Sequence, residues 1–143
     1  MRLLLRLAAV TALALGVIGE AGGAQVKITG IYSDLHFIAE AGDLLGTEIM
    51  IVPARGGEEW VVFHQHWEGY PRFPVVVPAS VKRDRITFEV RYPPEEDEKP
   101  EPATEYEGRI TTAGFEGIRR YPLANGTMAK EPVKLPRKKS YWE

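Results

Sequence analysis

Two histidines with a single residue between them, His64 and His66, lie in the segment EWVVFHQHWE. Residues two apart on a β-strand point to the same face, so both imidazoles would lie on one side. Neutral imidazoles in this arrangement can take two ligand positions around zinc or another divalent transition metal. The remaining histidine, His36, could supply a third, with Asp34 or Glu68 as the orienting carboxylate. One hypothesis is therefore a metal-binding protein that uses His36, His64 and His66, with hydrolysis as the activity that such a site supports.

A simpler interpretation places His64 and His66 at the polar end of a strand face. Trp60 and Val62 share that face by the same alternation, and these apolar side chains would belong to the core. The sequence contains no G-x-S-x-G, no H-E-x-x-H, no phosphate-binding glycine-rich loop and no cysteine. We therefore favour a protein with no metal, no cofactor and no catalytic residue, and keep the metal hypothesis as the alternative.

Aromatic residues are the second group that could form a site. Small closed sheets hold ligands at their mouths, where aromatic and apolar side chains line the pocket. We favour Tyr32, Trp60, Trp67 and Tyr70 as ligand-binding residues, because Trp67 and Tyr70 flank the turn that follows the histidines. The other aromatic residues would serve this pocket or the core: Phe37, Phe63, Phe73, Phe88, Tyr92, Tyr106, Phe115 and Tyr121.

The first 24 residues read MRLLLRLAAVTALALGVIGEAGGA. Two arginines precede an apolar stretch over residues 7–18, and small residues end the segment, which is the order of a secretory signal peptide. The apolar stretch is shorter than the about 20 residues of a membrane span. We therefore predict a signal peptide over 1–24 and an exported protein, periplasmic or secreted, without a transmembrane span.

The remaining 119 residues of the 143-residue chain suffice for one domain with a modest core. Without the leader the chain keeps 16 basic and 19 acidic side chains, so its charge gives no reason to expect a nucleic acid partner. Small secreted domains often depend on disulfides, but this chain contains no cysteine. Its stability must come from apolar burial, which favours a well-closed sheet.

Alternation of apolar and polar residues dominates the chain, and it is clearest in RDRITFEVRY. The connections between alternating segments are short, so neighbouring strands should pair antiparallel. We predict an all-β domain over 25–135, a small antiparallel up-and-down barrel of seven to eight strands, with a two-sheet sandwich as the alternative. The predicted strands cover 26–37, 46–53, 59–67, 73–82, 84–92, 104–112 and 114–121, with an eighth at 127–135.

Two charged segments stand apart from this pattern. Residues 93–105 combine four prolines with a run of acidic side chains, which is typical of a mobile, solvated loop. Residues 136–143 form a tail with three basic and two aromatic side chains, which could either pack on the barrel or contact a partner. These segments allow a third hypothesis, a structural or interaction protein of the cell envelope.

Three stretches carry a resemblance: GIYSDLHFIAEAGDLLGTEIMIV at 30–52, YEGRITTAGFEG at 106–117 and LPRKKSYW at 135–142. Together they resemble small exported bacterial proteins of unassigned activity with a lipocalin-like β-barrel layout. The chain departs from true lipocalins in lacking a G-x-W opening and disulfides. The resemblance implies a barrel and an exported location, and it transfers no catalytic residue. We therefore expect a non-enzymatic module that binds a small, partly apolar molecule or an envelope protein.

Overall fold

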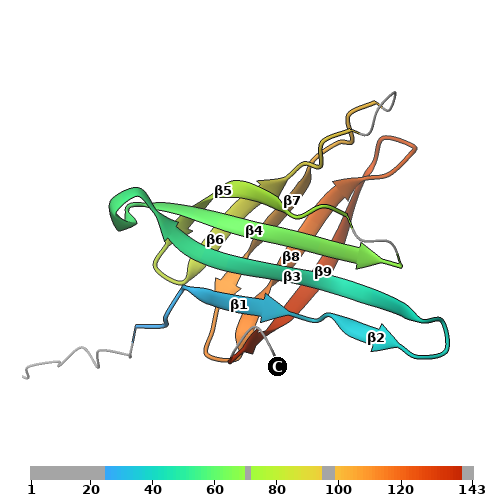
Figure 1. The fold of residues 1–143 in the computed structure, drawn as a ribbon. Helices are drawn as coiled ribbons and strands as arrows, with labels where there is room; N and C mark the ends of the chain where they lie inside the picture. The colour runs from blue at the N-terminus through green and yellow to red at the C-terminus, as the bar shows by residue number, and fades with distance from the viewer. Residues whose placement is uncertain (1–24, 70–71, 95–98, 140–143) are drawn as a thin grey trace, which may run out of the picture.

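The computed structural model describes residues 25–69, 72–94 and 99–139. Within these ranges the chain forms β-strands and one 3-10 turn, and no helix is long and apolar enough to cross a membrane (Figure 1). The elements are β1 (Gly30–Ser33), β2 (His36–Ile38), β3 (Asp43–Ala54), η1 (Arg55–Gly57), β4 (Glu59–Glu68), β5 (Val75–Lys82), β6 (Arg85–Val90), β7 (Thr104–Ile110), β8 (Gly114–Pro122) and β9 (Met128–Lys138).

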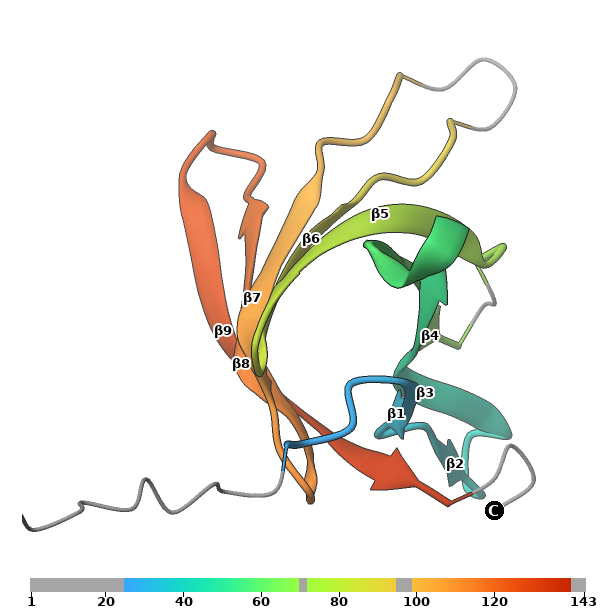
Figure 2. The same cartoon turned by 90° about the vertical axis from the view of Figure 1, so that its left-hand side faces the viewer.

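The sheet closes on itself as a barrel. Each strand from β3 to β8 pairs antiparallel with the next one along the chain, and β1 pairs with both β9 and β3. In the described part of the chain, eight strands thus form a ring, and β2 extends β3 outside it (Figure 2). The predicted antiparallel up-and-down barrel is confirmed, and the two-sheet sandwich is excluded. Closure leaves the ring strands paired on both sides, which removes edges that would invite aggregation.

Alternation decides which side chains enter the barrel. In β6, Ile86, Phe88 and Val90 are buried while the residues between them are exposed, as RDRITFEVRY predicts. Residues directly opposite one another in paired strands share a face, so the same phase continues around the ring. The buried apolar core is Ile28, Tyr32, Ile49, Ile51, Val62, Ile86, Phe88, Val90, Tyr106, Ile110, Phe115 and Leu135.

The strand predicted over 26–37 is wrong in its extent, because the structure divides it into β1 and β2. Asp34 lies between the two strands, and its Oδ1 accepts a hydrogen bond from the Thr47 backbone N at 2.6 Å. A side-chain oxygen therefore takes the place of a backbone acceptor in the ladder. Gly46 leaves room for it, because a Cβ there would lie only 2.8 Å from Asp34. Alternation in the sequence continues through this break and does not reveal it.

Residues 25–29 cover one end of the barrel, where Ile28 is buried (Figure 2). The Tyr32 hydroxyl donates to the Ile28 carbonyl at 2.6 Å. Arg137 lies over the Tyr32 ring, 4.7 Å from its centroid, and donates to the Tyr32 hydroxyl at 2.7 Å and to the Thr29 carbonyl at 3.1 Å. Packing and hydrogen bonds thus close this end.

The charged segments lie partly within the barrel strands. Residues 136–138, which the sequence assigns to the basic tail, continue β9, and Tyr141 and Trp142 lie outside the described residues. Thr104 and Glu105, at the end of the acidic segment, belong to β7. Residues 95–98 of that segment and the predicted signal peptide 1–24 also lie outside the described residues.

Two facing glycines let β7 and β8 approach the Phe115 ring. Gly108 pairs with Gly117, and a Cβ on Gly108 would lie 2.6 Å from Phe115 Cε2. A Cβ on Gly117 would lie 2.3 Å from the Glu107 carbonyl oxygen. These distances are shorter than van der Waals contact, so only glycine fits at these two positions without a shift of backbone or ring.

We expect Gly117→Ala to lower the free energy of unfolding by about 1 to 3 kcal/mol, the usual cost of overpacking a well-filled interior. The added methyl group meets backbone of a paired strand, which cannot move without disturbing the ladder. Urea denaturation measures the effect. Glu116→Ala on the outer face is the control and should change stability by less than about 0.5 kcal/mol. Equal stability of the two variants would contradict this account of the glycine pair.

Candidate functional site

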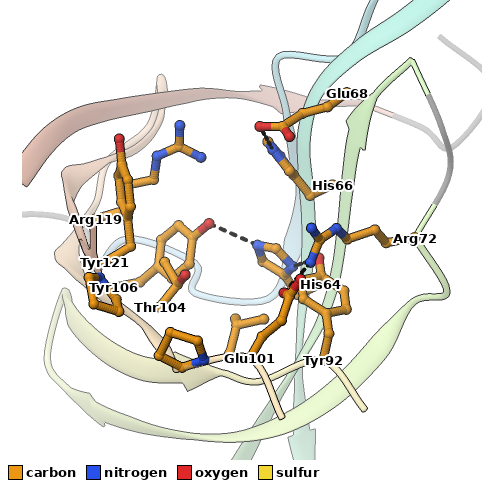
Figure 3. Close-up of a pocket in the computed structure, with 13 residues that line it drawn as sticks. His64, His66, Glu68, Arg72, Tyr92, Glu101, Thr104, Tyr106, Arg119 and Tyr121 are labelled. Atoms are coloured by element: carbon orange, nitrogen blue, oxygen red, sulfur yellow. Dashed lines mark hydrogen bonds and ion pairs between the residues drawn. The ribbon is translucent and has the colours of Figure 1, made fainter. Parts of the chain in front are cut away.

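A cavity of about 370 Å³ opens at the barrel end opposite the one that Arg137 closes. Side chains from β4, β6, β7 and β8 form its wall, and the segments after β4 and before β7 complete the rim (Figure 3). Its size is in the range of small-molecule sites. The lining residues are His64, His66, Glu68, Arg72, Val90, Tyr92, Glu101, Pro102, Thr104, Tyr106, Arg119, Tyr121 and Pro122.

His64 forms the floor of the cavity and has hydrogen bonds on both ring nitrogens. Its Nδ1 lies 3.0 Å from the Tyr92 hydroxyl, and its Nε2 lies 3.0 Å from the Tyr106 hydroxyl (Figure 3). The side chain is only 2% exposed. Burial, with His66 and Arg119 as additional positive neighbours, lowers the pKa of His64 from 6.5 to about 3. The imidazole is therefore neutral at physiological pH.

A stack of aromatic rings positions Tyr106 beneath the cavity. Tyr106 packs face to face on Phe88, with 4.7 Å between ring centroids and 6° between ring planes. Phe88 in turn packs against Phe115, 6.5 Å away between centroids. Phe88 and Tyr106 are directly opposite each other in β6 and β7, so the stack is a cross-strand pair. The core layer of the barrel thereby holds the polar groups of the cavity floor in place.

Ion pairs surround this floor. Arg119 pairs with Glu131 of β9 at 2.8 Å, and Glu131 also accepts a hydrogen bond from the Tyr121 hydroxyl. On the other side of the cavity, Arg72 pairs with Glu101, and its guanidinium lies 5.0 Å from the centroid of the Tyr92 ring. Each arginine of the cavity thus has a glutamate partner.

His66 lies above His64 on the same strand face and links β3 to the rim. Its Nδ1 lies 2.8 Å from Thr47 Oγ1, and its Nε2 lies 3.0 Å from Glu68 Oε1. The hydrogen bond from His66 is the largest of the causes that lower the pKa of Glu68. Thr47 is buried and does not line the cavity, so its hydroxyl is not presented to the cavity as a nucleophile. The hydrogen bonds that join Thr47, His66 and Glu68 stabilise the cavity wall instead.

The cavity therefore combines a neutral imidazole, phenols and compensated charges with apolar surface. Burial raises the pKa of both Tyr92 and Tyr106, so both hydroxyls stay protonated at neutral pH. The polar groups offer hydrogen bonds, while Val90 and the tyrosine rings offer apolar contact. This arrangement suits a small molecule with both an apolar body and a polar group.

Three of the four ligand-binding residues predicted from the sequence, Tyr32, Trp60 and Trp67, do not line this cavity. Tyr32 is completely buried at the closed end, beneath Arg137. Trp60 packs against the core near the start of β4, and Trp67 alternates onto the outer face of that strand. The Trp67 Nε1 is buried without a hydrogen-bond partner among the described residues. Tyr70 lies outside the described residues, so the structure does not place it.

The predicted convergence of three histidines is not what the structure shows. His64 and His66 meet at the cavity, but His36 is exposed on β2, outside the barrel, where its Nδ1 lies 3.0 Å from the Asp34 carbonyl. Among residues 25–69, 72–94 and 99–139, no group of three or more His, Cys, Asp or Glu side chains could hold a metal ion. The physical reason is the break at Asp34, which turns β2 away from the ring.

Sequence reasoning missed the two arginines and Glu101. For Arg119 a signal exists: counting by twos from Phe115 in GFEGIRRY places Gly117, Arg119 and Tyr121 on the inner face. A charged residue on a core-facing position indicates a paired or functional group. Glu101 has no such signal, because it lies in a run of acidic residues without periodicity.

The described fold and cavity define a closed eight-stranded antiparallel β-barrel with one packed end and one polar, open end. Comparison of the chain with models of protein families, with curated proteins and with solved structures gives no significant match.

Proposed function

We propose that this protein is a binding module that holds a small, partly apolar molecule in the open-end cavity. The observation that carries the proposal is the cavity itself: about 370 Å³, lined by apolar rings and by polar groups fixed from beneath. Natural ligand sites are concave and mostly apolar, with a few placed polar groups that orient the ligand. The amphiphilic lining of this cavity agrees with that description.

A non-enzymatic role fits the protonation states of the cavity. A general acid or base works best when its pKa lies near the working pH. Burial lowers the pKa of His64 to about 3, so this imidazole cannot donate a proton as an acid at neutral pH and is a weak base. The phenols of Tyr92 and Tyr106 have raised pKa values and stay protonated. These groups are suited to hydrogen bonding in a stable complex.

Export is part of the same proposal. The order of charged, apolar and small residues over 1–24 supports a signal peptide, and the resemblance to small exported bacterial proteins agrees with it. A periplasmic or secreted location would expose the open cavity to small molecules outside the cytoplasm. Fractionation of cells that express the full chain tests this part, with the mature mass expected after cleavage at Ala24.

Binding is tested with ethylbenzene and acetophenone as small probes, observed by amide NMR of the protein. We expect both probes to shift the amide signals of Val90, Thr104 and Tyr106, because these residues line the cavity. Thr104→Phe should weaken probe binding at least tenfold by filling the cavity. Thr87→Phe, on the outward face of β6, is the matched control and should leave binding unchanged. If neither probe shifts these signals in the wild-type protein, the proposed function is wrong.

A further inference from the structure

The hydrogen bonds of His64 limit how its two tyrosine partners can be protonated. A neutral imidazole has one N–H donor and one acceptor nitrogen. One of the two tyrosines must therefore donate to His64, while the other accepts from it. The tyrosine that accepts keeps its own hydroxyl proton free for another partner. Which tyrosine this is determines what the cavity offers to a ligand.

Burial decides between the two arrangements. The hydrogen bond between Tyr106 and His64 is buried, whereas the one between Tyr92 and His64 is only partly buried. Tyr106 is 3% exposed, so leaving its proton without an acceptor would carry the cost of a buried unsatisfied donor. Among the described residues, the acceptor to which this hydroxyl forms a hydrogen bond is His64 Nε2, at 3.0 Å. Tyr106 therefore donates to Nε2, and the proton of the imidazole lies on Nδ1.

The Tyr92 hydroxyl is then an acceptor toward His64 and a free donor toward the cavity. His64 Nδ1–H donates to its oxygen across 3.0 Å. Among the described residues, none accepts the proton of the Tyr92 hydroxyl, and Tyr92 lines the cavity. The direction of donation runs from Tyr106 through His64 to Tyr92, and it ends on a proton for which the described residues supply no acceptor.

The charges around the cavity favour an uncharged acceptor. Arg72 and Arg119 are already paired with Glu101 and Glu131, and Glu68 adds a further carboxylate. His64 contributes no positive charge. An anion would lose its hydration on entry without meeting an uncompensated cation, and this desolvation is costly. A neutral carbonyl loses much less hydration and still accepts the hydrogen bond from Tyr92.

We infer that the ligand of this cavity is an uncharged, largely apolar molecule whose carbonyl-type oxygen accepts a hydrogen bond from the Tyr92 hydroxyl. The inference rests on the proposed binding function and adds the chemical class of the ligand. The Tyr106–His64 pair sets the direction of this hydrogen bond, and the rings of Tyr92, Tyr106 and Tyr121 supply the apolar contact.

The tautomer of His64 can be measured without any ligand. Nitrogen-15 NMR of the histidine rings distinguishes a neutral imidazole protonated on Nδ1 from one protonated on Nε2. We expect the Nδ1–H form for His64 at pH 7. Tyr106→Phe, which removes the hydrogen bond donor to Nε2, should reduce the population of this form. Finding His64 protonated on Nε2 in the wild-type protein would overturn the inference, whatever the cavity binds.

The preference for a carbonyl is tested with three probes of similar shape: acetophenone, ethylbenzene and benzoate. Acetophenone should bind about five to ten times more tightly than ethylbenzene, the range expected for one hydrogen bond in a cavity. Benzoate should bind more weakly than acetophenone because of its charge. Tyr92→Phe should remove the advantage of acetophenone over ethylbenzene.

Tyr121→Phe is the matched control, because Tyr121 lines the same cavity but already donates its proton to Glu131. This variant should retain the preference for acetophenone. If acetophenone and ethylbenzene bind equally to the wild-type protein, or if Tyr92→Phe keeps the preference, the inference is wrong while the binding function stands. If benzoate binds most tightly, the ligand class is anionic. If no probe reaches the cavity, the proposed function fails as well.

Discussion

Lowering the pH from 7 to 5 should reduce the free energy of unfolding by about 2 kcal/mol through His64 alone. The pKa of this imidazole is lowered from 6.5 to about 3 in the folded protein. Between these values the unfolded chain binds the proton and the folded protein does not, so protonation favours unfolding. The loss from this one group would approach roughly 4 kcal/mol near pH 3. Urea denaturation at several pH values measures it.

The choice of pH 5 separates this effect from the carboxylates. The pKa values of Glu68 and Glu131 are lowered from 4.5 in the folded protein, so their contribution to stability is lost mainly at lower pH. His64→Gln retains a donor and an acceptor but cannot take up a proton in this range. Its stability should therefore change by about 2 kcal/mol less between pH 7 and 5 than that of the wild-type protein.

His36→Gln is the matched control, because His36 is exposed on β2 outside the barrel. Its pH dependence should follow that of the wild-type protein. The comparison uses the change with pH within each variant, so a constant loss of stability from the substitution does not affect it. An identical pH dependence for wild-type and His64→Gln would show that His64 is not held neutral by burial.

The fold was predictable because period-two alternation and short connections are local properties of the sequence. Residues 84–92 show this directly, since Ile86, Phe88 and Val90 enter the core as the alternation requires. The break between β1 and β2 was not predictable in the same way. It depends on a hydrogen bond between Asp34 and Thr47 and on the space above Gly46, which are contacts between strands.

The site was less predictable than the fold for a related reason. Alternation correctly placed His64 and His66 on one face, but it does not say which strands face each other across the interior. Tyr92 and Tyr106 lie 28 and 42 residues after His64 in the sequence, and the curvature of the ring brings them together. The closed end likewise depends on Arg137 meeting Tyr32, residues near opposite ends of the described chain.

Phe115→Ala should lower the free energy of unfolding by about 3 to 5 kcal/mol, the usual range for removing a fully buried aromatic ring. Phe115 is 0% exposed and lies over the glycine pair of β7 and β8. The backbone of β7 and β8 already lies against this ring at Gly108 and Gly117 and is held by the ladder between the two strands. It therefore has little freedom to move into the space that the ring leaves. Most of the cavity created by the substitution should therefore persist. Urea denaturation at pH 7 gives the stability.

The same substitution should disturb the functional site, because Phe88 lies between Phe115 and Tyr106. Once Phe88 can tilt, the Tyr106 hydroxyl loses its fixed position against His64, and the ring nitrogen signals of His64 should shift. Phe73→Ala is the control: its side chain is 87% exposed, so stability should change by less than about 0.5 kcal/mol and His64 should be unaffected. A Phe115→Ala protein of reduced stability but unchanged His64 signals would show that the core and the open-end cavity are independent.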